Sequence, residues 1–453
     1  MAAPSFRSDE LAPAQPVSPA TTRTKTSPDA IPKAAALFPL TTIDLPVGNY
    51  PSVSSHVVEN AAPGTPRASE AEPTYATIDS EESLATLGAD WDALVRAMPR
   101  PSPFLLHGWI TEWWRHYGDG CSLGVEAAFR EGRLVAALPL VSFRRHGLEV
   151  ATFLGGRNSA LGDLLLADGE SPAVAAQLVD RAVASGRDYL DVFGLPGGCR
   201  LTEASEAHPL HVFERIESPV LDLSRGWSET YRLKTNSKKR GHHRQRRRQL
   251  EGLGKVRVSW ARTLPELKPA VEHAFRVHAL RWRGRPDGSG FVTPHGMRFN
   301  RAVLRAQAAV DAARIVTLTL DDRPIAFAWC IALEQRLYLY RTAFDPAFAR
   351  FSPGLVNTLN LFELAAAEGL TRVEFLGGAE RYKVEFADRF EPLSMGLGLP
   401  GTTAGRAVVA ARARWLRLRD VAKQSAAARQ LYDRAAPARR RLARSPDALR
   451  PSG

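Results

Sequence analysis

The sequence LYLYRTAFDPAFARFSPGLVNTLNLFELAAAEGLTRVEFLGGAERYK, residues 337–383, holds the pattern on which the fold prediction rests. Its first eight residues are leucine, aromatic and other strand-forming side chains, and Asp345-Pro346 ends the predicted strand. Ser352 and Pro353 suit the N-cap and first position of a helix, and Val373–Leu376 predicts a second strand. A turn that presents amide N–H groups at a helix start, beside strand ends, predicts an anion-binding site.

Length and cysteine content narrow the class of protein. A chain of 453 residues predicts two folded domains with tails. Cys121, Cys199 and Cys330 are far apart and odd in number, which disfavours disulfides and a thiolate metal site and favours a reducing compartment. No apolar run approaches the roughly 20 residues of a membrane span, and the first residues lack the pattern of a secretion signal. We therefore expect a cytoplasmic protein.

Positive charge is concentrated at the carboxyl end of the chain. Residues 401–453 contain 13 Lys and Arg and 3 Asp, so this tail carries +10 of the formal net charge of +12. The tail is rich in Ala and Arg, is predicted to be helical and has a thin apolar stripe that includes Trp415 and Leu418. It could contact an anionic membrane surface, join a synthase complex or pack back on the domains.

Composition also divides the rest of the chain. Residues 1–73 hold 12 of the 32 prolines and show no periodicity, which predicts disorder. The predicted organisation is a disordered segment at 1–73, a domain at 74–225, a basic connecting helix at 226–255, a second domain at 256–400 and a basic helical tail at 401–453.

A pattern of helix and strand occurs twice in the chain. Ser171-Pro172 opens a predicted helix that is followed by a strand at 190–194, and Ser352-Pro353 precedes a helix followed by a strand at 373–377. The distances from Ser171 to Leu190 and from Ser352 to Val373 are 19 and 21 residues. Each strand contains one acidic residue, Asp191 or Glu374. The match predicts a duplicated α/β unit.

Several common chemistries lack their motifs. The chain contains no His-Glu-x-x-His, no Gly-x-Ser-x-Gly and no Walker-type loop. His273 and His278 are five residues apart, off a common helix face, so no metal is predicted and these side chains are expected to pack or to contact substrate. The basic run 234–248 could bind nucleic acid, but it lacks interleaved aromatic residues. A solvated helix face between two domains is the favoured interpretation.

A series of short motifs carries a resemblance to a known family. In chain order they are Trp91, Pro103-Phe104-Leu105, Leu138-Pro139-Leu140, Phe153-Leu154-Gly155-Gly156, His278-x-x-Arg281-Trp282, Pro324-Ile325-Ala326, Phe351-Ser352-Pro353-Gly354, Phe375-Leu376-Gly377-Gly378 and Tyr382-Lys383. This pattern resembles the BioF2-like acetyltransferase family of the GNAT superfamily, which is similar to CelD-type proteins of bacterial cellulose biosynthesis. The resemblance covers roughly residues 75–400. It implies an α/β fold of two tandem GNAT domains, with mixed sheets flanked by helices, as in the FemABX transferases.

The resemblance also implies acetyl-CoA or another acyl-CoA as donor. Ordinary GNAT enzymes hold the pyrophosphate with Gln/Arg-x-x-Gly-x-Gly/Ala at a helix start. Here Arg350 matches the leading residue, but the single Gly354 comes one place late and Pro353 removes an N–H donor, which would weaken binding rather than abolish it. The residues expected to contact the donor are Tyr340, Arg341, Thr342, Arg350, Phe351, Ser352, Gly354 and Leu355.

The implied reaction is direct attack of an amine or hydroxyl on the thioester. An amine with a pKa of about 10.4 must lose a proton, which costs roughly 4.6 kcal/mol at pH 7, and a nearby carboxylate could accept it. Glu380 is the candidate base, with Glu385 and Asp345 behind it. Tyr382 could return a proton to the thiolate, and Lys383 could bind an anionic acceptor. Alternatively, Glu380 and Lys383 form only surface ion pairs.

Three functions fit these observations. The first is an acyl-CoA-dependent N- or O-acyltransferase, such as an acetyltransferase, that acts on a small-molecule or glycan-precursor acceptor in exopolysaccharide, cellulose or cell-envelope metabolism. The second is a FemABX-like transferase whose donor is aminoacyl-tRNA. The third is a non-catalytic scaffold of a polysaccharide synthase complex. Because the first half lacks an equivalent of Tyr382-Lys383, only the second half is expected to bind donor, with the acceptor in the cleft between the halves.

Overall fold

The structure is a computed structural model that describes residues 71–284, 289–378 and 380–424. The segment predicted to be disordered lies outside these residues except for its last three, and so does the predicted basic tail beyond residue 424. Within the described part of the chain, no helix is long and apolar enough to cross a membrane.

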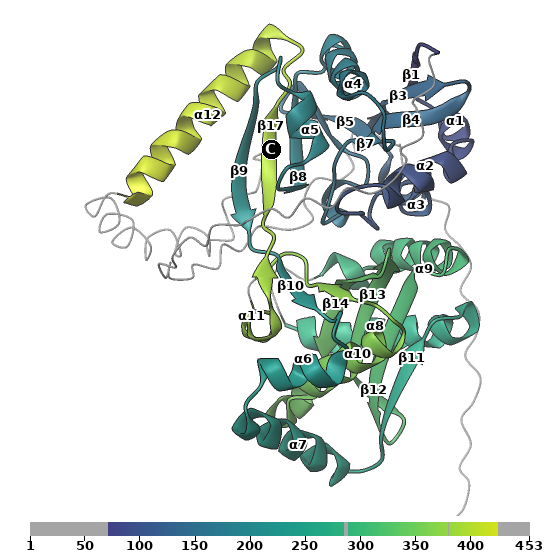
Figure 1. Ribbon diagram of the computed structural model, residues 1–453, viewed down its shortest axis with the longest axis vertical. Coiled ribbons are helices and arrows are strands. Elements are labelled where there is room, and N and C mark those ends of the chain that lie inside the picture. Colours follow the sequence, from purple (N-terminus) through teal and green to yellow (C-terminus); the bar gives the residue numbers. More distant parts are fainter. Residues whose placement is uncertain (1–70, 285–288, 379, 425–453) are drawn as a thin grey trace, which may run out of the picture. The chain divides into compact units, whose positions relative to one another are not determined.

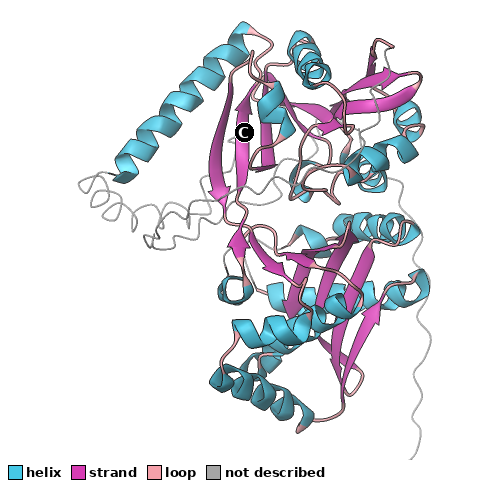
Figure 2. Ribbon diagram, viewed as in Figure 1, coloured by secondary structure: helices cyan, strands magenta, loops and turns pink. Residues whose placement is uncertain are grey.

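The first half of the described chain forms two sheets with helices against them (Figure 1, Figure 2). Its elements are β1 (Thr74–Ile78), α1 (Glu81–Ala85), α2 (Gly88–Arg96), α3 (His107–Tyr117), β2 (Cys121–Leu123), β3 (Val125–Arg130), β4 (Arg133–Leu138), β5 (Leu140–Arg145), β6 (Leu148–Phe153), η1 (Gly156–Asn158), β7 (Leu165–Leu166), α4 (Pro172–Ala184), β8 (Tyr189–Pro196), α5 (Arg200–Ala204) and β9 (Leu210–Ile216). The sheet orders are β1-β3-β4-β7 and β2-β5-β6-β8-β17-β9.

The second half is built on one seven-stranded sheet of order β11-β12-β13-β14-β15-β10-β16. Its elements are β10 (Pro219–Asp222), α6 (Trp227–Lys234), α7 (Ser237–Glu251), β11 (Val256–Ala261), α8 (Leu264–Trp282), η2 (Gly290–Val292), α9 (Pro294–Ala309), β12 (Ala313–Leu320), β13 (Arg323–Leu333), β14 (Arg336–Phe344), η3 (Pro346–Phe351), α10 (Pro353–Ala367), β15 (Arg372–Glu374), α11 (Arg381–Phe386) and β16 (Arg389–Phe390). The described chain ends with β17 (Leu393–Gly398) and α12 (Thr403–Gln424).

The two halves exchange strands. β17 follows the second half in sequence but pairs between β8 and β9 of the first half (Figure 1). β10 precedes the second half's helices and pairs between β15 and β16 of its sheet. Sheet membership therefore crosses the predicted domain limits at 225 and 400, because the chain passes between the sheets at β9–β10 and again at β16–β17.

Each half contains one pair of parallel neighbouring strands joined by a helix. β6 and β8 are parallel, with Val150 opposite Tyr189, and α4 lies between them in sequence. β14 and β15 are parallel, with Tyr338 opposite Glu374, and α10 lies between them. Parallel neighbours cannot be joined by a tight hairpin and need such a crossover. The duplicated α/β unit predicted from the spacing is therefore present in both halves.

Helices α3 and α9 pack closely between the halves. A Cβ on Gly108 would lie only 2.8 Å from Cβ of Ala306, so the glycine permits this approach. The Trp109 ring packs edge-on against Phe299 at 5.7 Å and against Tyr340 at 5.4 Å between centroids. The apolar core is therefore continuous from the first half to the second.

The described part of the basic tail is the helix α12, which begins against the first half. Val409 is buried with Val150, Tyr189 and Leu397, whereas Trp415 and Leu418 are exposed further along the helix. Arg412 lies over the Trp415 ring, 4.3 Å from its centroid. The tail predicted to be helical is helical up to Gln424.

Candidate functional site

The turn before α10 presents backbone N–H groups at the start of a helix. The short helix η3 ends at Phe351, and α10 begins at Pro353. Because the N–H groups in the first turn of a helix have no acceptor within it, those of Gly354 and Leu355 are available to a ligand. The helix dipole favours an anion at this position. This is the turn for which the sequence predicts phosphate binding, and it is called the phosphate turn below.

Ser352 is the N-cap residue that the sequence predicts, but it has an unusual backbone conformation. It occupies the N-cap position, but its φ of 55° and ψ of 49° are left-handed and its side chain makes no capping hydrogen bond. A non-glycine residue in this region costs about 1–3 kcal/mol and persists only where its surroundings impose it. Hydrogen bonds from the Ser352 N–H to Ala349 (3.0 Å) and from the Val356 N–H to the Ser352 carbonyl (3.2 Å) hold the turn.

Gly354 lets the end of β14 lie against this turn. A Cβ on Gly354 would be 3.0 Å from Cδ1 of Phe344, closer than side chains normally pack. Arg350 stacks on the neighbouring Phe351, with its guanidinium carbon 4.5 Å from the ring centroid. No carboxylate among the described residues forms an ion pair with Arg350. Its charge is thus available to an anion at the turn.

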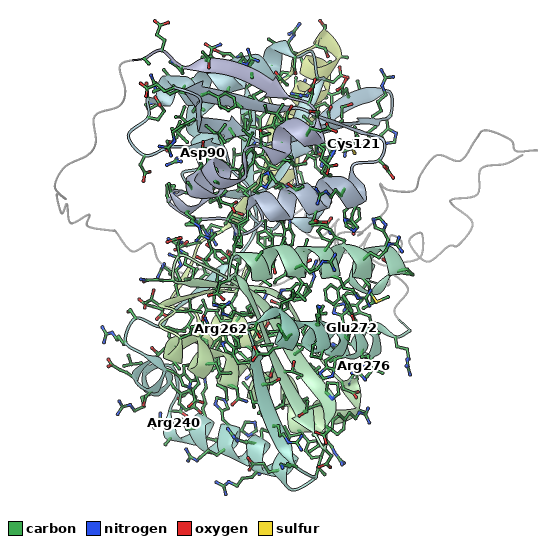
Figure 3. All side chains as sticks on the ribbon, turned by 90° about the vertical axis from the view of Figure 1, so that its right-hand side faces the viewer. Asp90, Cys121, Arg240, Arg262, Glu272 and Arg276 are labelled. Carbon is green, nitrogen blue, oxygen red and sulfur yellow. The ribbon has the colours of Figure 1, made fainter. Side chains whose placement is uncertain are left out.

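The basic helix α7 packs beside the phosphate turn, which sequence reasoning did not foresee. Arg246 donates a hydrogen bond of 2.6 Å to the carbonyl oxygen of Arg350. At the other end of the helix, Lys239 pairs with Glu385 at 3.0 Å, and Arg240 donates to the Thr235 carbonyl (Figure 3). The charge and aromatic content of residues 234–248 do not indicate this contact, because its two partners are 104 residues apart in the chain.

The parallel strands β14 and β15 separate directly beside this turn. Their pairing covers only residues 336–338 and 372–374. Beyond it, the N–H groups of Phe375 and Gly378 bond to Pro219 and Glu217 instead. The register of β13 with β14 shifts at Trp329 and Cys330, opposite an extra residue, Tyr340. A bulge changes the direction of the side chains that follow it. Because β15 no longer pairs with β14 beyond Tyr338, the backbone of residues 340–342 has no strand partner among the described residues on the β15 side.

The three predicted contacts on β14 have different surroundings. The Tyr340 ring is buried beside Trp109 and Trp329, and its hydroxyl lies 3.0 Å from Oδ1 of Asn300, so only its backbone can meet a ligand. Arg341 lies over that ring, with its guanidinium carbon 4.6 Å from the centroid. Thr342 is exposed and hydrogen-bonds with Tyr382 of α11. The strands thus bring Thr342 and Tyr382 together from opposite sides of the opening.

Tyr382 is an uncharged phenol at this opening. Burial raises its pKa to about 12, and the Glu380 carboxylate acts in the same direction, whereas the hydrogen bond with Thr342 opposes the shift. The ring packs edge-on against Phe375. A phenol with this pKa stays protonated at neutral pH, so it can donate a proton.

Glu380 and Lys383 form an ion pair at the start of α11. The Glu380 side chain is 58% exposed and accepts from Nζ of Lys383 at 2.8 Å, while the Lys383 side chain is only 9% exposed. Nζ of Lys383 also donates to the Gly377 carbonyl at 3.0 Å. These two bonds hold Lys383 within the corner, whereas the sequence analysis had Lys383 free to bind an anionic acceptor. Glu380 remains accessible.

Asp345 and Glu385, the two alternative candidates for the base, form ion pairs with other residues. Asp345 is buried, pairs with Arg323 at 2.5 Å and accepts from the Ala347 N–H at 3.0 Å, so it caps η3. Glu385 pairs with Lys239 of α7. Of the three carboxylates, Glu380 is the one beside Tyr382.

A buried charge cluster surrounds Glu374, the last residue of β15, for which the sequence predicted only an acidic residue within a strand. Glu374 has no exposed side-chain surface and pairs with Arg372 at 2.6 Å, with Arg100 at 2.8 Å and with Arg336 at 3.5 Å. Arg100 belongs to the first half, and it also bonds to Ser218 at 3.0 Å. Glu374 therefore links the two halves through Arg100.

The corresponding opening in the first half is nearly filled. Beside β6 and β8 there is a cavity of about 20 Å³, which is room for about one water molecule. Thr152, Gly156, Arg157, Ser159 and Asp191 are among its lining residues. Among the described residues, no three His, Cys, Asp or Glu side chains gather in a way that could hold a metal ion.

Comparisons with known proteins agree with this architecture. Residues 237–384 match the family model described as an acetyltransferase (GNAT) domain. The crystal structure of FemX is 11% identical at a TM-score of 0.50, and the match covers 72% of this chain and 97% of FemX. A tandem GNAT protein from the clavulanic acid biosynthesis pathway is 14% identical at a TM-score of 0.43, covering 73% and 99% of the two chains. No curated protein matches the sequence.

The C-terminal domain of a putative lysylphosphatidylglycerol synthetase from Agrobacterium fabrum is also similar, at 14% identity, a TM-score of 0.46 and coverage of 74% and 96%. The predicted fold class, tandem GNAT-like α/β units with mixed sheets flanked by helices, is confirmed. The residues that match the GNAT domain model, 237–384, include the phosphate turn, the opening of β14 and β15, and the Glu380–Lys383 corner.

Proposed function

We propose that the protein transfers an acyl group from an acyl-CoA, such as acetyl-CoA, to an amine or hydroxyl acceptor, with the donor bound in the second half. The observation that carries this proposal is the position of the phosphate turn at the open end of β14 and β15, with Tyr382 across the opening. The resemblance to CelD-type proteins supports an acceptor from exopolysaccharide, cellulose or cell-envelope metabolism.

Each part of the donor has a complementary group. The N–H groups of Gly354 and Leu355, with Arg350, suit the pyrophosphate. The unpaired backbone edge of residues 340–342 suits the amides of the pantetheine arm, which would add to the sheet like a short strand. This places the thioester beside Thr342 and Tyr382.

The chemical step then needs two proton transfers. The acceptor nitrogen or oxygen attacks the thioester carbon and gives its proton to Glu380. The carbon–sulfur bond breaks, and the sulfur takes a proton from Tyr382. Lys383 orients Glu380 through their ion pair. A positioned acid or base of this kind typically accelerates a reaction by about 10²–10⁴-fold.

Binding of the donor is tested by calorimetric titration with acetyl-CoA. We expect saturable binding to the wild-type protein and at least tenfold weaker binding to Gly354→Glu, because the new carboxylate would occupy the anion position and repel the phosphates. Gly354→Ala is the matched control, since it adds the Cβ against Phe344 without charge, and it should bind more tightly than Gly354→Glu. A wild-type protein that binds no CoA ester would contradict the proposal.

Tyr382→Phe should lower kcat by about tenfold and leave KM for the donor nearly unchanged. The effect is below the usual range for a general acid because a thiol with a pKa of about 8.5 leaves readily without help. Steady-state release of free CoA measures both constants. Tyr231→Phe, which removes another phenol of the second half, is the control, and equal rates for Tyr382→Phe and wild type would remove Tyr382 from the mechanism.

The contact between α7 and the phosphate turn supports a second candidate, a transferase that takes its acyl group from aminoacyl-tRNA. Arg246 and the neighbouring basic side chains of α7 could contact RNA phosphates next to the site. Such binding weakens steeply with salt. Band-shift titrations with aminoacyl-tRNA at two salt concentrations distinguish the donors: tight, salt-sensitive binding together with no acetyl-CoA binding would favour the second candidate.

A further inference from the structure

Arg341 is a half-buried cation near the end of β14 that has no counter-charge. Other arginines on this sheet have carboxylate partners: Arg314 pairs with Glu368 at 2.5 Å, and Arg372 pairs with Glu374 at 2.6 Å. No carboxylate among the described residues forms an ion pair with Arg341, whose guanidinium lies over the Tyr340 ring. Arg341 also hydrogen-bonds with the Tyr340 side chain, but that group is neutral. A guanidinium partly withdrawn from water without a counter-charge is unfavourable, so an anion from outside the chain would provide that counter-charge.

The described groups around Arg341 come from both halves, and apart from its neighbour in β14 the ones that its charge acts on are a histidine and a tyrosine. On the α8 side lies His278, which is buried and stacks on Trp282 at 5.7 Å between centroids. From the first half comes Tyr117, the last residue of α3, whose ring packs against His295 at 4.7 Å. The positive charge of Arg341 acts on both groups, lowering the pKa of His278 and opposing the rise in the pKa of Tyr117 that burial causes.

Two further polar groups lie at this place. Nε2 of His278 is 2.8 Å from Oγ of Ser289, but its buried Nδ1 has no hydrogen-bond partner among the described residues. Asn158 of η1 accepts from the Trp113 indole at 3.2 Å and hydrogen-bonds with Tyr117. A buried polar atom without a partner is rare, and a ligand that bonds to Nδ1 would satisfy it.

Arg341 and the donor corner lie on opposite faces of the sheet. Successive side chains of a strand point to opposite faces, and Thr342 meets Tyr382. The helices α8 and α3 pack on the other face, with Phe327 and Trp329, and Trp329 is opposite Arg341 in the pairing of β13 with β14. Tyr340, the extra residue of the bulge, is exempt from the alternation and packs on this same face. An anion on Arg341 would therefore reach the opening of β14 and β15 from the face opposite Tyr382.

We propose that Arg341 is the anion-binding residue of the acceptor site, and that the acceptor carries a carboxylate or phosphate close to its nucleophile. The identification of the anion as part of the acceptor rests on the proposed function, whereas the presence of an anion site at Arg341 does not. Arg341 donates to the anion, with Tyr117, Asn158 and His278 as the uncharged polar groups around it. The acceptor's amine or hydroxyl then lies toward the opening, where the thioester carbon is.

Anion binding can be tested without any activity. Phosphate and acetate are titrated separately, at constant ionic strength maintained with chloride, into the full chain carrying Gly354→Glu, which blocks the phosphate turn, and melting temperature is followed. We expect a saturable rise for at least one anion, and the more effective anion identifies the acceptor's group. Adding Arg341→Gln should weaken the apparent affinity at least tenfold, while adding Arg276→Gln, at an exposed position of α8 (Figure 3), should not.

Equal affinities with and without Arg341, or no saturable rise for either anion, would overturn the proposal. A second measurement concerns the acceptor: transfer from acetyl-CoA to an amino acid is compared with transfer to its amide. The wild type should prefer the acid and Arg341→Gln should lose that preference through KM. If no transfer occurs with any acceptor, the proposed function fails, and the anion titration alone decides the role of Arg341.

Discussion

Glu374→Gln should lower the free energy of unfolding by about 3–5 kcal/mol, because removing one partner of a buried ion pair leaves uncompensated charge. The carboxylate has no exposed surface, and three guanidinium groups, from Arg100, Arg336 and Arg372, converge on it. An amide of the same shape would leave these cations facing one another without a counter-charge. Since Arg100 belongs to the first half, the loss should also loosen the junction of the halves.

Urea unfolding monitored by tryptophan fluorescence measures this change. The matched control is Glu334→Gln, which breaks the pair between Arg96 and Glu334, another contact between the halves at 2.8 Å. Both side chains of that pair are at least 40% exposed, so its loss should cost about 0–1 kcal/mol. Equal destabilisation by the two substitutions would show that the buried ion pairs of Glu374 contribute no more to the free energy of unfolding than an exposed pair does.

The second large effect is a loss of stability in mild acid that depends on His278. Burial, assisted by the charge of Arg341, lowers the pKa of His278 from 6.5 to about 3. Because the unfolded chain binds this proton below about pH 6.5 and the folded protein does not, stability falls as the pH drops from 6.5 toward 3. The loss should reach about 2 kcal/mol at pH 5, at 1.36 kcal/mol for each pH unit.

His278→Gln isolates this contribution. The variant should be less stable than wild type at pH 7.5, because the imidazole packs against Phe291 and Trp282, but the difference should shrink by about 2 kcal/mol at pH 5. Melting temperatures and urea midpoints at the two pH values provide the measurement. His211→Gln, at a partly exposed position of β9, is the control. A constant difference between wild type and His278→Gln at both pH values would argue against a neutral His278.

The duplicated helix–strand unit and the phosphate turn could be predicted from local patterns. Proline and serine at a helix start and apolar periodicity act within a few residues, so they can be read along the chain. The same patterns gave the N-cap position of Ser352 correctly, but they did not show that its backbone is left-handed or that its side chain makes no capping hydrogen bond. They also left Asp345 and Glu385 as possible bases, because a sequence does not show that Arg323 and Lys239 lie beside them.

The sequence by itself determined that residues 337–376 form a strand, a turn, a helix and a second strand, with Glu380, Tyr382 and Lys383 following soon after. The tertiary structure alone decided which of these side chains are available. It buried the Tyr340 ring, tied Lys383 to Gly377, and left Arg341 without a counter-charge beside groups from α3 and α8. The physical reason is that charge compensation and burial depend on residues up to hundreds of positions apart, as between Arg100 and Glu374, which only the folded chain brings into contact.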